Sequence, residues 1–143
     1  QLIEKTNQFN INGIRHSETE FTNILASGGR LFTAHLDDRI GHHGEILACL
    51  VDCESVVRAL AMSCRVFQRR VEHAFISWLS THWTAGTLRF HVIPTERNEP
   101  ALRFFGAAYF FERDEFVEFN AAALQAAHEK DMALFTLIEK GIN

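Results

Sequence analysis

Cysteine and proline are both scarce in this sequence, and their scarcity limits the kind of protein that it describes. The 143 residues include three cysteines and two prolines. An odd cysteine count in a chain long enough to bury a core argues against a disulfide scaffold and favours reduced thiols. We therefore expect a cytoplasmic protein. With no repeat, no low-complexity stretch and so few prolines, no internal linker is apparent, and residues 1–143 are predicted to form a single domain.

Long apolar runs and concentrated positive charge are also missing. The longest unbroken apolar run, Ile46 to Val51, is too short to cross a bilayer, and the opening residues carry no signal-peptide pattern. The formal net charge is −4, and Arg69-Arg70 is only a local basic spot. Binding to DNA or RNA normally needs a basic surface that neutralises phosphates. We therefore expect neither a membrane nor a nucleic acid as a partner.

Phenylalanine is the aromatic residue that is abundant. The sequence has 13 Phe, one Tyr and two Trp, and 47% of its residues are apolar. A phenylalanine ring has no polar tip that needs a hydrogen-bond partner, so most of these rings are expected in the core.

The order of periodic segments predicts a mixed α/β domain. Ser17 and Glu20 have the spacing of a capping box, which places the start of a helix that ends at Gly28-Gly29. Apolar periodicity then predicts, in order, strands 30–37, 45–52 and 56–63, a long helix with a stripe over 67–79, strand 88–93, helix 98–107, strand 109–119 and helix 121–140. This order predicts an α/β (α+β) fold with a mixed, mostly antiparallel central sheet flanked by helices.

Three segments resemble one protein family. Lys5 to Asn10, Met62 to Val66, and Ile93-Pro94-Thr95 with Asn98 resemble the C-terminal half of the FkbH-like proteins of polyketide biosynthesis. The resemblance implies an N-acetyltransferase-like (GNAT) fold. It also implies a preceding phosphatase-like (HAD) domain in the same polypeptide and an acyl carrier protein as partner. The whole protein would load a glyceryl unit from a phosphorylated three-carbon acid onto that carrier protein.

The phosphatase-like half of that family carries an Asp-x-Asp motif that this chain does not contain. Asp37-Asp38 and the isolated Asp52 do not reproduce it. The chain also begins with Gln1 rather than methionine. We therefore expect a fragment, with the phosphoryl chemistry located in a domain outside it.

The junction between strand 56–63 and the next helix is the first candidate site. GNAT folds place there a loop that starts with Arg or Gln and carries glycines whose amides approach a pyrophosphate. The loop here starts with Arg65, but Gln68 and Arg70 stand at the glycine positions, and their large side chains disfavour the binding of ordinary coenzyme A. The phosphopantetheine of a carrier protein remains a possible ligand, and coenzyme A a less favoured one. No cofactor is expected to be required. The predicted pantetheine- and phosphate-binding residues are Ser63, Arg65, Val66, Phe67, Gln68, Arg69, Arg70 and Asn98. The alternative is that these arginines form an ordinary solvated turn.

Two further positions bear on catalysis. Cys64 lies at the same junction and is a candidate nucleophile, with a buried packing thiol as the alternative, while Cys49 and Cys53 are assigned to the core. Asn98 matches the asparagine that contacts the pantetheine arm in acyltransferases, with a simple helix cap as the alternative. Phe105 stands where that motif carries a proton-donating tyrosine, and a phenylalanine cannot donate a proton.

Two hypotheses follow for the function. In the first, the strands 56–63 and 88–93 separate beside residue 65 and receive a thiol-bearing arm, so that the domain acts in acyl transfer to a carrier protein. In the second, the domain is a non-catalytic docking or structural module. Eight histidines are present, but they lack the ligand spacing of a metal site, so no metal is expected.

Overall fold

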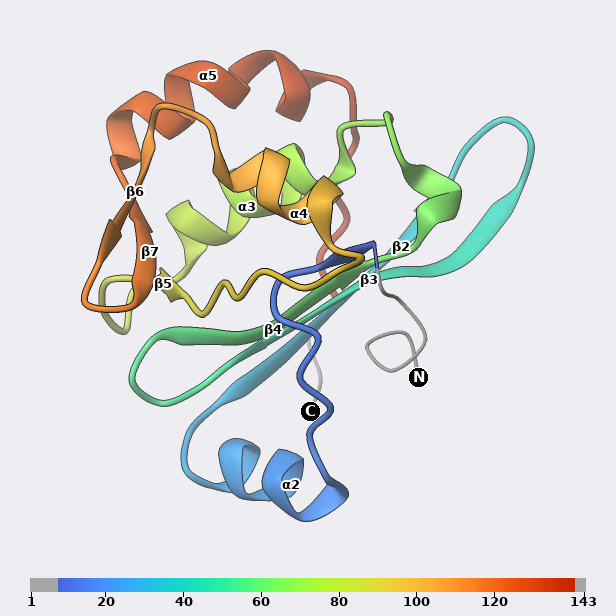
Figure 1. The fold of residues 1–143 in the computed structure, drawn as a ribbon. Helices are drawn as coiled ribbons and strands as arrows, with labels where there is room; N and C mark the ends of the chain where they lie inside the picture. Colours follow the sequence, from blue (N-terminus) through green and yellow to red (C-terminus); the bar gives the residue numbers. More distant parts are fainter. Residues whose placement is uncertain (1–7, 141–143) are drawn as a thin grey trace.

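The computed structural model describes residues 8–140 as a mixed α/β fold with a mostly antiparallel seven-stranded sheet (Figure 1). Of the opening segment Lys5 to Asn10, residues 5–7 lie outside the described part. The elements are β1 (Phe9–Asn10), α2 (Glu18–Ala26), β2 (Arg30–Asp37), β3 (His42–Val51), β4 (Val56–Met62), a 3-10 turn η1 (Cys64–Val66), α3 (Val71–His82), β5 (Arg89–Phe90), α4 (Glu99–Phe105), β6 (Phe110–Arg113), β7 (Phe116–Phe119) and α5 (Ala121–Ala133).

The strands follow the order β2-β3-β4-β5-β7-β6, and β1 pairs separately with β4. Strands β4 and β5 form the one parallel pair among the described strands, because α3 connects them as a crossover; the other pairs are antiparallel. Strand β4 lies at the centre of the sheet and is almost entirely buried. The predicted mostly antiparallel sheet is therefore confirmed.

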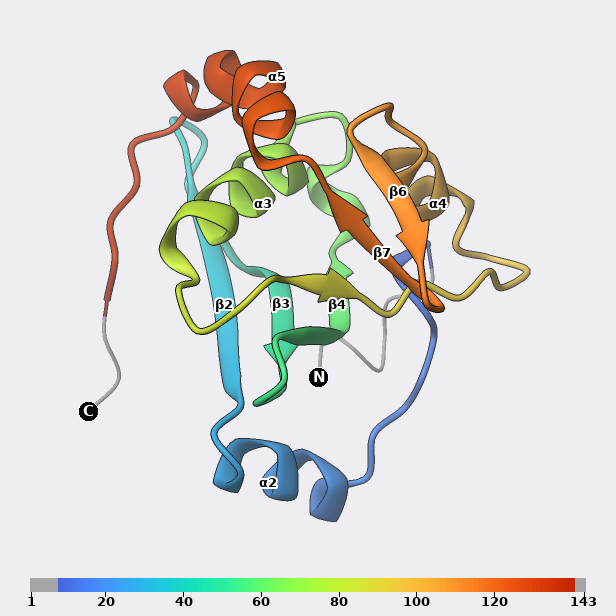
Figure 2. The same ribbon diagram turned by 90° about the vertical axis from the view of Figure 1, so that its left-hand side faces the viewer.

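Helices cover the two faces of the sheet unequally. Helices α3, α4 and α5 lie on one face and α2 lies on the other (Figures 1 and 2). The core under α3 and α4 is rich in phenylalanine, as predicted. Five phenylalanines are buried and five more pack partly buried against them: Phe9, Phe90, Phe104, Phe105 and Phe110, then Phe32, Phe67, Phe75, Phe119 and Phe135.

The capping box of α2 forms as predicted, but several element boundaries differ from the prediction. Strand 109–119 is instead the hairpin β6–β7, because Asp114 and Glu115 both take left-handed backbone angles (φ 51° and 71°) and reverse the chain. Strand 88–93 shortens to β5, and the final helix ends at Ala133 rather than near residue 140.

The long helix α3 begins at Val71 rather than near Arg65. Gln68 and Arg70 adopt φ angles of 66° and 61°, in the left-handed region that interrupts a helix. These are the two positions at which the sequence comparison with a GNAT loop expects glycines, and their backbone takes a conformation that glycine favours although the side chains are large.

Within residues 8–140, no helix is both long enough and apolar enough to cross a membrane.

Candidate functional site

Strands β4 and β5 separate after a short contact. Val56 pairs with Arg89 and Val57 with Phe90, and beyond these residues no further pairing joins the two strands. The final hydrogen bond between them runs from the His91 amide to the Val57 carbonyl at 3.1 Å. The separation that the sequence predicts is therefore present.

The space between the separated strands is filled by the chain itself. Strand β1 pairs with the second half of β4 through Phe9–Met62 and Asn10–Ala61. The amide of Ile11 then donates to the Leu60 carbonyl (3.1 Å), and the carbonyl of Ile11 accepts from the Ile93 amide (2.8 Å). Residues 9–12, which we call the inserted segment, are at most 5% exposed.

Two asparagine side chains hold the inserted segment between β4 and residues 91–93. The Asn12 amide group donates to the carbonyls of Arg58 and His91, at 2.9 Å each. Asn98 is fully buried, and its amide group donates to the carbonyls of Asn10 (2.8 Å) and Ile93 (2.9 Å). Each asparagine therefore satisfies polar backbone groups on two segments at once.

The inserted segment changes the interpretation of the predicted slot. An extended pantetheine arm would need the backbone groups of Leu60 and Ile93 that Ile11 already uses. The prediction of an open slot is therefore wrong for this structure. Asn98 contacts the protein's own backbone, and it forms no side-chain cap on α4 although it occupies the N-cap position.

At the junction, Ser63 and Arg65 form a local contact pair. The Ser63 hydroxyl accepts from the backbone amide of Arg65 (3.3 Å) and from its guanidinium (3.0 Å). A second guanidinium nitrogen donates to the Glu45 carbonyl on β3 (3.3 Å). The neighbouring Val66 is fully buried and Phe67 is half-buried in the core, so neither presents a side chain to a ligand.

Arg69 joins the junction to the β2–β3 hairpin. Its guanidinium donates to the Asp38 carboxylate (2.9 Å), which also contacts His43 (2.8 Å). These two partners hold the pKa of Asp38 well below its ordinary value. Gln68 is exposed. The exposed side chains of Arg65 and Arg69 remain within reach of a partner on this side of the molecule.

Arg70 is committed to an internal ion pair. Its guanidinium donates two hydrogen bonds to the Asp131 carboxylate on α5, which is 6% exposed. Asp131 also accepts from Nδ1 of the buried His128 (2.8 Å), and His128 Nε2 accepts from the Tyr109 hydroxyl. The Asp131 carboxylate thus pairs with the guanidinium that was predicted to bind a ligand phosphate. Arg70 is therefore not free to bind one.

The four-residue network of Arg70, Tyr109, His128 and Asp131 is electrostatically self-consistent. Burial raises the pKa of Asp131, but the bonds from Arg70 and His128 outweigh it and leave that pKa below its ordinary value. Burial, followed by the charges of His73 and Arg70, lowers the pKa of His128 against the opposing effect of Asp131. An ionised Asp131 and a neutral His128 match the observed donors and acceptors.

The lowered pKa of His128 predicts a pH dependence of stability. Because the folded state binds this proton less readily than the unfolded chain, the free energy of unfolding should fall as pH decreases below the ordinary imidazole value of 6.5. Denaturant titrations across this range should show a shallower pH slope for His128→Gln. His42 is exposed and Asp37 raises its pKa, so its contribution to the slope lies above pH 6.5, and His42→Gln should leave the slope below that value nearly unchanged. Equal slopes for His128→Gln and the unchanged protein would contradict the assignment.

The remaining catalytic candidates are not brought together. Cys64 is exposed at the start of η1, so the alternative of a buried packing thiol is wrong, but among residues 8–140 no side chain forms a hydrogen bond or an ion pair with its thiol. Cys49 is buried, as predicted, whereas Cys53 lies exposed in the β3–β4 turn. Phe105 packs against Phe90 and Phe110 in the core.

A hollow of about 410 Å³ lies between α4 and the β6–β7 hairpin, and none of the predicted site residues lines it. At the tip of the β2–β3 hairpin, His42 pairs with Asp37 and His43 pairs with Asp38. Within residues 8–140, no group of three or more His, Cys, Asp or Glu residues has the arrangement of a metal site.

Sequence reasoning missed three residues that decide the site: Asn12, His128 and Asp131. Asn12 lies two residues beyond segment 5–10, which resembles the FkbH-like proteins, and this position was the available signal. His128 and Asp131 lie one helical turn apart on α5, a spacing that places them on one face, but nothing in the sequence names Arg70 and Tyr109 as their partners.

Comparisons of the chain with models of known protein families, with curated protein sequences and with solved structures find no match.

Proposed function

We propose that this chain is a GNAT-like domain of an FkbH-like protein that handles a glyceryl-type acyl group with an acyl carrier protein in polyketide biosynthesis. Within that protein, its own part is to dock the carrier protein rather than to transfer the acyl group. The observation that carries the docking role is the inserted segment, which closes the space between β4 and β5 with the chain's own hydrogen bonds.

Two further features support docking over transfer. The ion pair between Arg70 and Asp131 removes an arginine from the predicted phosphate site. The buried Phe105 cannot protonate a departing thiolate, and Tyr109, the single tyrosine, gives its hydroxyl to His128. Acyl transfer would need both an anchored arm and a proton donor, and the described residues supply neither at the junction.

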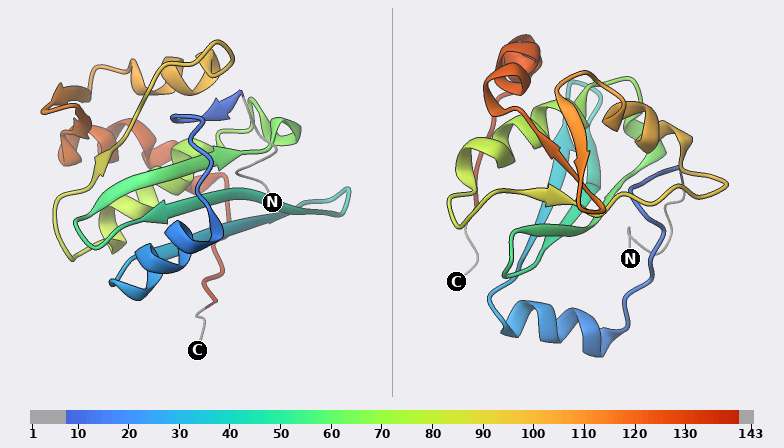
Figure 3. Two further views of the ribbon diagram at one scale, coloured as in Figure 1. Left: turned by 60° about the horizontal axis from the view of Figure 1, so that its bottom comes forward. Right: turned by 60° about the vertical axis from the view of Figure 1, so that its left-hand side comes forward.

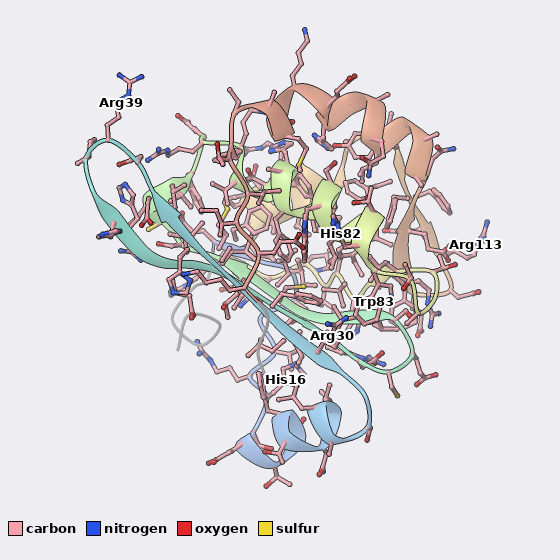
Figure 4. All side chains as sticks on the ribbon, turned by 180° about the vertical axis from the view of Figure 1, so that it is seen from behind. His16, Arg30, Arg39, His82, Trp83 and Arg113 are labelled. Atoms are coloured by element: carbon pink, nitrogen blue, oxygen red, sulfur yellow. The ribbon has the colours of Figure 1, made fainter. Side chains whose placement is uncertain are left out.

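The surface proposed for docking lies beside the tip of the β2–β3 hairpin. We define it by Arg39, Arg65 and Arg69. Arg39 extends into solvent from the hairpin tip (Figure 4), and the bond between Arg69 and Asp38 holds the junction against that hairpin. Exposed arginines form charge-assisted hydrogen bonds with carboxylates and phosphates, so this surface suits acidic groups on a carrier protein.

The test compares carrier protein with and without its arm. Docking predicts that the chain binds a polyketide acyl carrier protein equally well in its apo form and in its phosphopantetheine-loaded form, and does not bind coenzyme A. Calorimetry measures all three affinities. If arm insertion operates, the loaded form should bind at least about tenfold more tightly than the apo form, because the arm would add its own contacts.

Matched surface variants locate the contact. The double variant Arg65→Ala, Arg69→Ala should weaken carrier binding by at least about thirtyfold, since each of the two charge-assisted contacts contributes about 1 kcal/mol or more. The control Arg103→Ala, Arg113→Ala removes two exposed arginines elsewhere and should leave the affinity unchanged. Docking would be contradicted by an equal loss of carrier affinity in both double variants. It would also be contradicted if neither carrier form bound, or if this chain transferred an acyl group from the carrier protein.

The cytoplasmic location is part of the same proposal. All three cysteines are free thiols, which fits a reducing compartment.

A further inference from the structure

A group of basic side chains lies on the sheet face opposite to α3. Phe90 packs against Phe105 and Phe110 on the helical side, so the adjacent Arg89 and His91 point to the other face. There the guanidinium of Arg89 lies 4.5 Å from the centre of the Phe116 ring, and the imidazole of His91 lies 5.8 Å from it.

Arg58 of β4 completes this group from the neighbouring strand. Its guanidinium lies 5.9 Å from the centre of the Phe116 ring and donates to the Asp52 carboxylate (2.7 Å). Among residues 8–140, no carboxylate lies within ion-pair distance of Arg89. Asp52 therefore pairs with Arg58, whereas Arg89 has no ion-pair partner among these residues.

His16 forms the buried end of the same group. It precedes α2 and lies between that helix and the sheet (Figure 4). Its side chain is only 10% exposed, and neither ring nitrogen has a hydrogen-bond partner among the described residues. The nearest carboxylate oxygen, on Glu20, is 3.8 Å from Nδ1, too far for a hydrogen bond. A buried imidazole whose nitrogens make no hydrogen bond is costly, which points to a group that supplies one.

His16 also acts electrostatically on His91. Burial is the largest cause of the lowered pKa of His91, and the charges of Arg58 and His16 lower it further, against an opposing effect of Glu115. Four basic side chains thus act on one small region, and their mutual repulsion favours binding of a negatively charged group.

We propose that His16, Arg58, Arg89 and His91 form a binding site for a small oxyanion, a carboxylate or a phosphate monoester, over the ring of Phe116. Arg89 and His91 line its solvent side, and His16 donates from its buried end. The site lies on the sheet face opposite to α3, and its existence does not depend on carrier binding.

The test follows the histidine ring protons by NMR during titration of the whole chain with inorganic phosphate, sodium acetate or sodium chloride at matched ionic strength. The variants His16→Gln and His91→Gln assign the two resonances. We expect saturable shifts of both resonances with phosphate or acetate and none with chloride. The stronger of the two ligands identifies the class of oxyanion.

Arginine variants separate a built site from general charge effects. Arg89→Gln should weaken the binding by at least about tenfold, because one charge-assisted bond contributes about 1.5–3 kcal/mol. Arg30→Gln is the matched control, since Arg30 is also a strand arginine stacked on a phenylalanine, 5.5 Å from the Phe32 ring centre, but on the edge strand β2. Three results would overturn the proposal. The shifts could follow ionic strength alone, the two arginine variants could behave equally, or the His16 resonance could fail to respond to either oxyanion.

Discussion

Asn98→Ala is expected to lower the free energy of unfolding by about 2–4 kcal/mol. The substitution removes both donors of a fully buried amide and leaves the carbonyls of Asn10 and Ile93 without them. Each buried polar group that loses its partner costs about 1–3 kcal/mol. Urea denaturation of the variant measures the loss.

Asn120→Ala provides the matched control. Asn120 is an exposed N-cap whose side chain accepts from the Ala123 amide, and its removal should cost about 1 kcal/mol. In Asn98→Ala alone, the amides of Ile11 and Ile93 should also exchange hydrogen faster, because both belong to the inserted segment's hydrogen bonds. Equal stability losses in the two variants, with unchanged exchange at these amides, would show that Asn98 does not hold the segment.

Asp131→Ala is expected to destabilise the fold by about 2–3 kcal/mol. The substitution leaves Arg70 and the buried His128 without their shared carboxylate. Removing one partner of a buried ion pair costs about 3–5 kcal/mol, and the half-exposed Arg70 reduces this value because water can solvate it. Thermal and denaturant unfolding both report the change.

The control for this loss is Glu99→Ala. It breaks the fully surface-exposed pair with Arg103 on α4, which should contribute no more than about 0.5 kcal/mol. A double-variant cycle on Arg70 and Asp131 isolates their coupling. If Asp131→Ala costs no more than Glu99→Ala, the network does not hold α5 on α3, and Arg70 is available to a ligand after all.

Local elements were predictable because their causes lie within a few residues. Ser17 and Glu20 are three positions apart, and their reciprocal bonds start α2 as the pattern predicts. Strand β2 has the predicted bounds, since alternation of apolar residues is a local property. That Phe105 cannot donate a proton was also predictable, because it follows from residue type alone. The hairpin β6–β7 was missed because Asp114 and Glu115 are not the glycines that usually mark such a turn.

The candidate site was only half predictable. The sequence indicated that β4 and β5 separate and which residues surround the junction. It did not indicate that residues 9–12 return to fill the gap, because the bond between Asn98 and Asn10 joins positions 88 apart. Arg70 and Asp131 are 61 positions apart, and the pattern around Arg70 equally suited a free phosphate ligand.

The amino-acid sequence by itself determined the class of fold, the start of α2, the central buried strand and the phenylalanine at position 105. The tertiary structure alone decided that the gap is closed, that Arg70 is neutralised from α5 and that His16 lies buried without a hydrogen-bond partner. The physical reason is range. Caps and periodicity act between neighbours along the chain, whereas the pairing of a buried polar group depends on which distant segment packs against it.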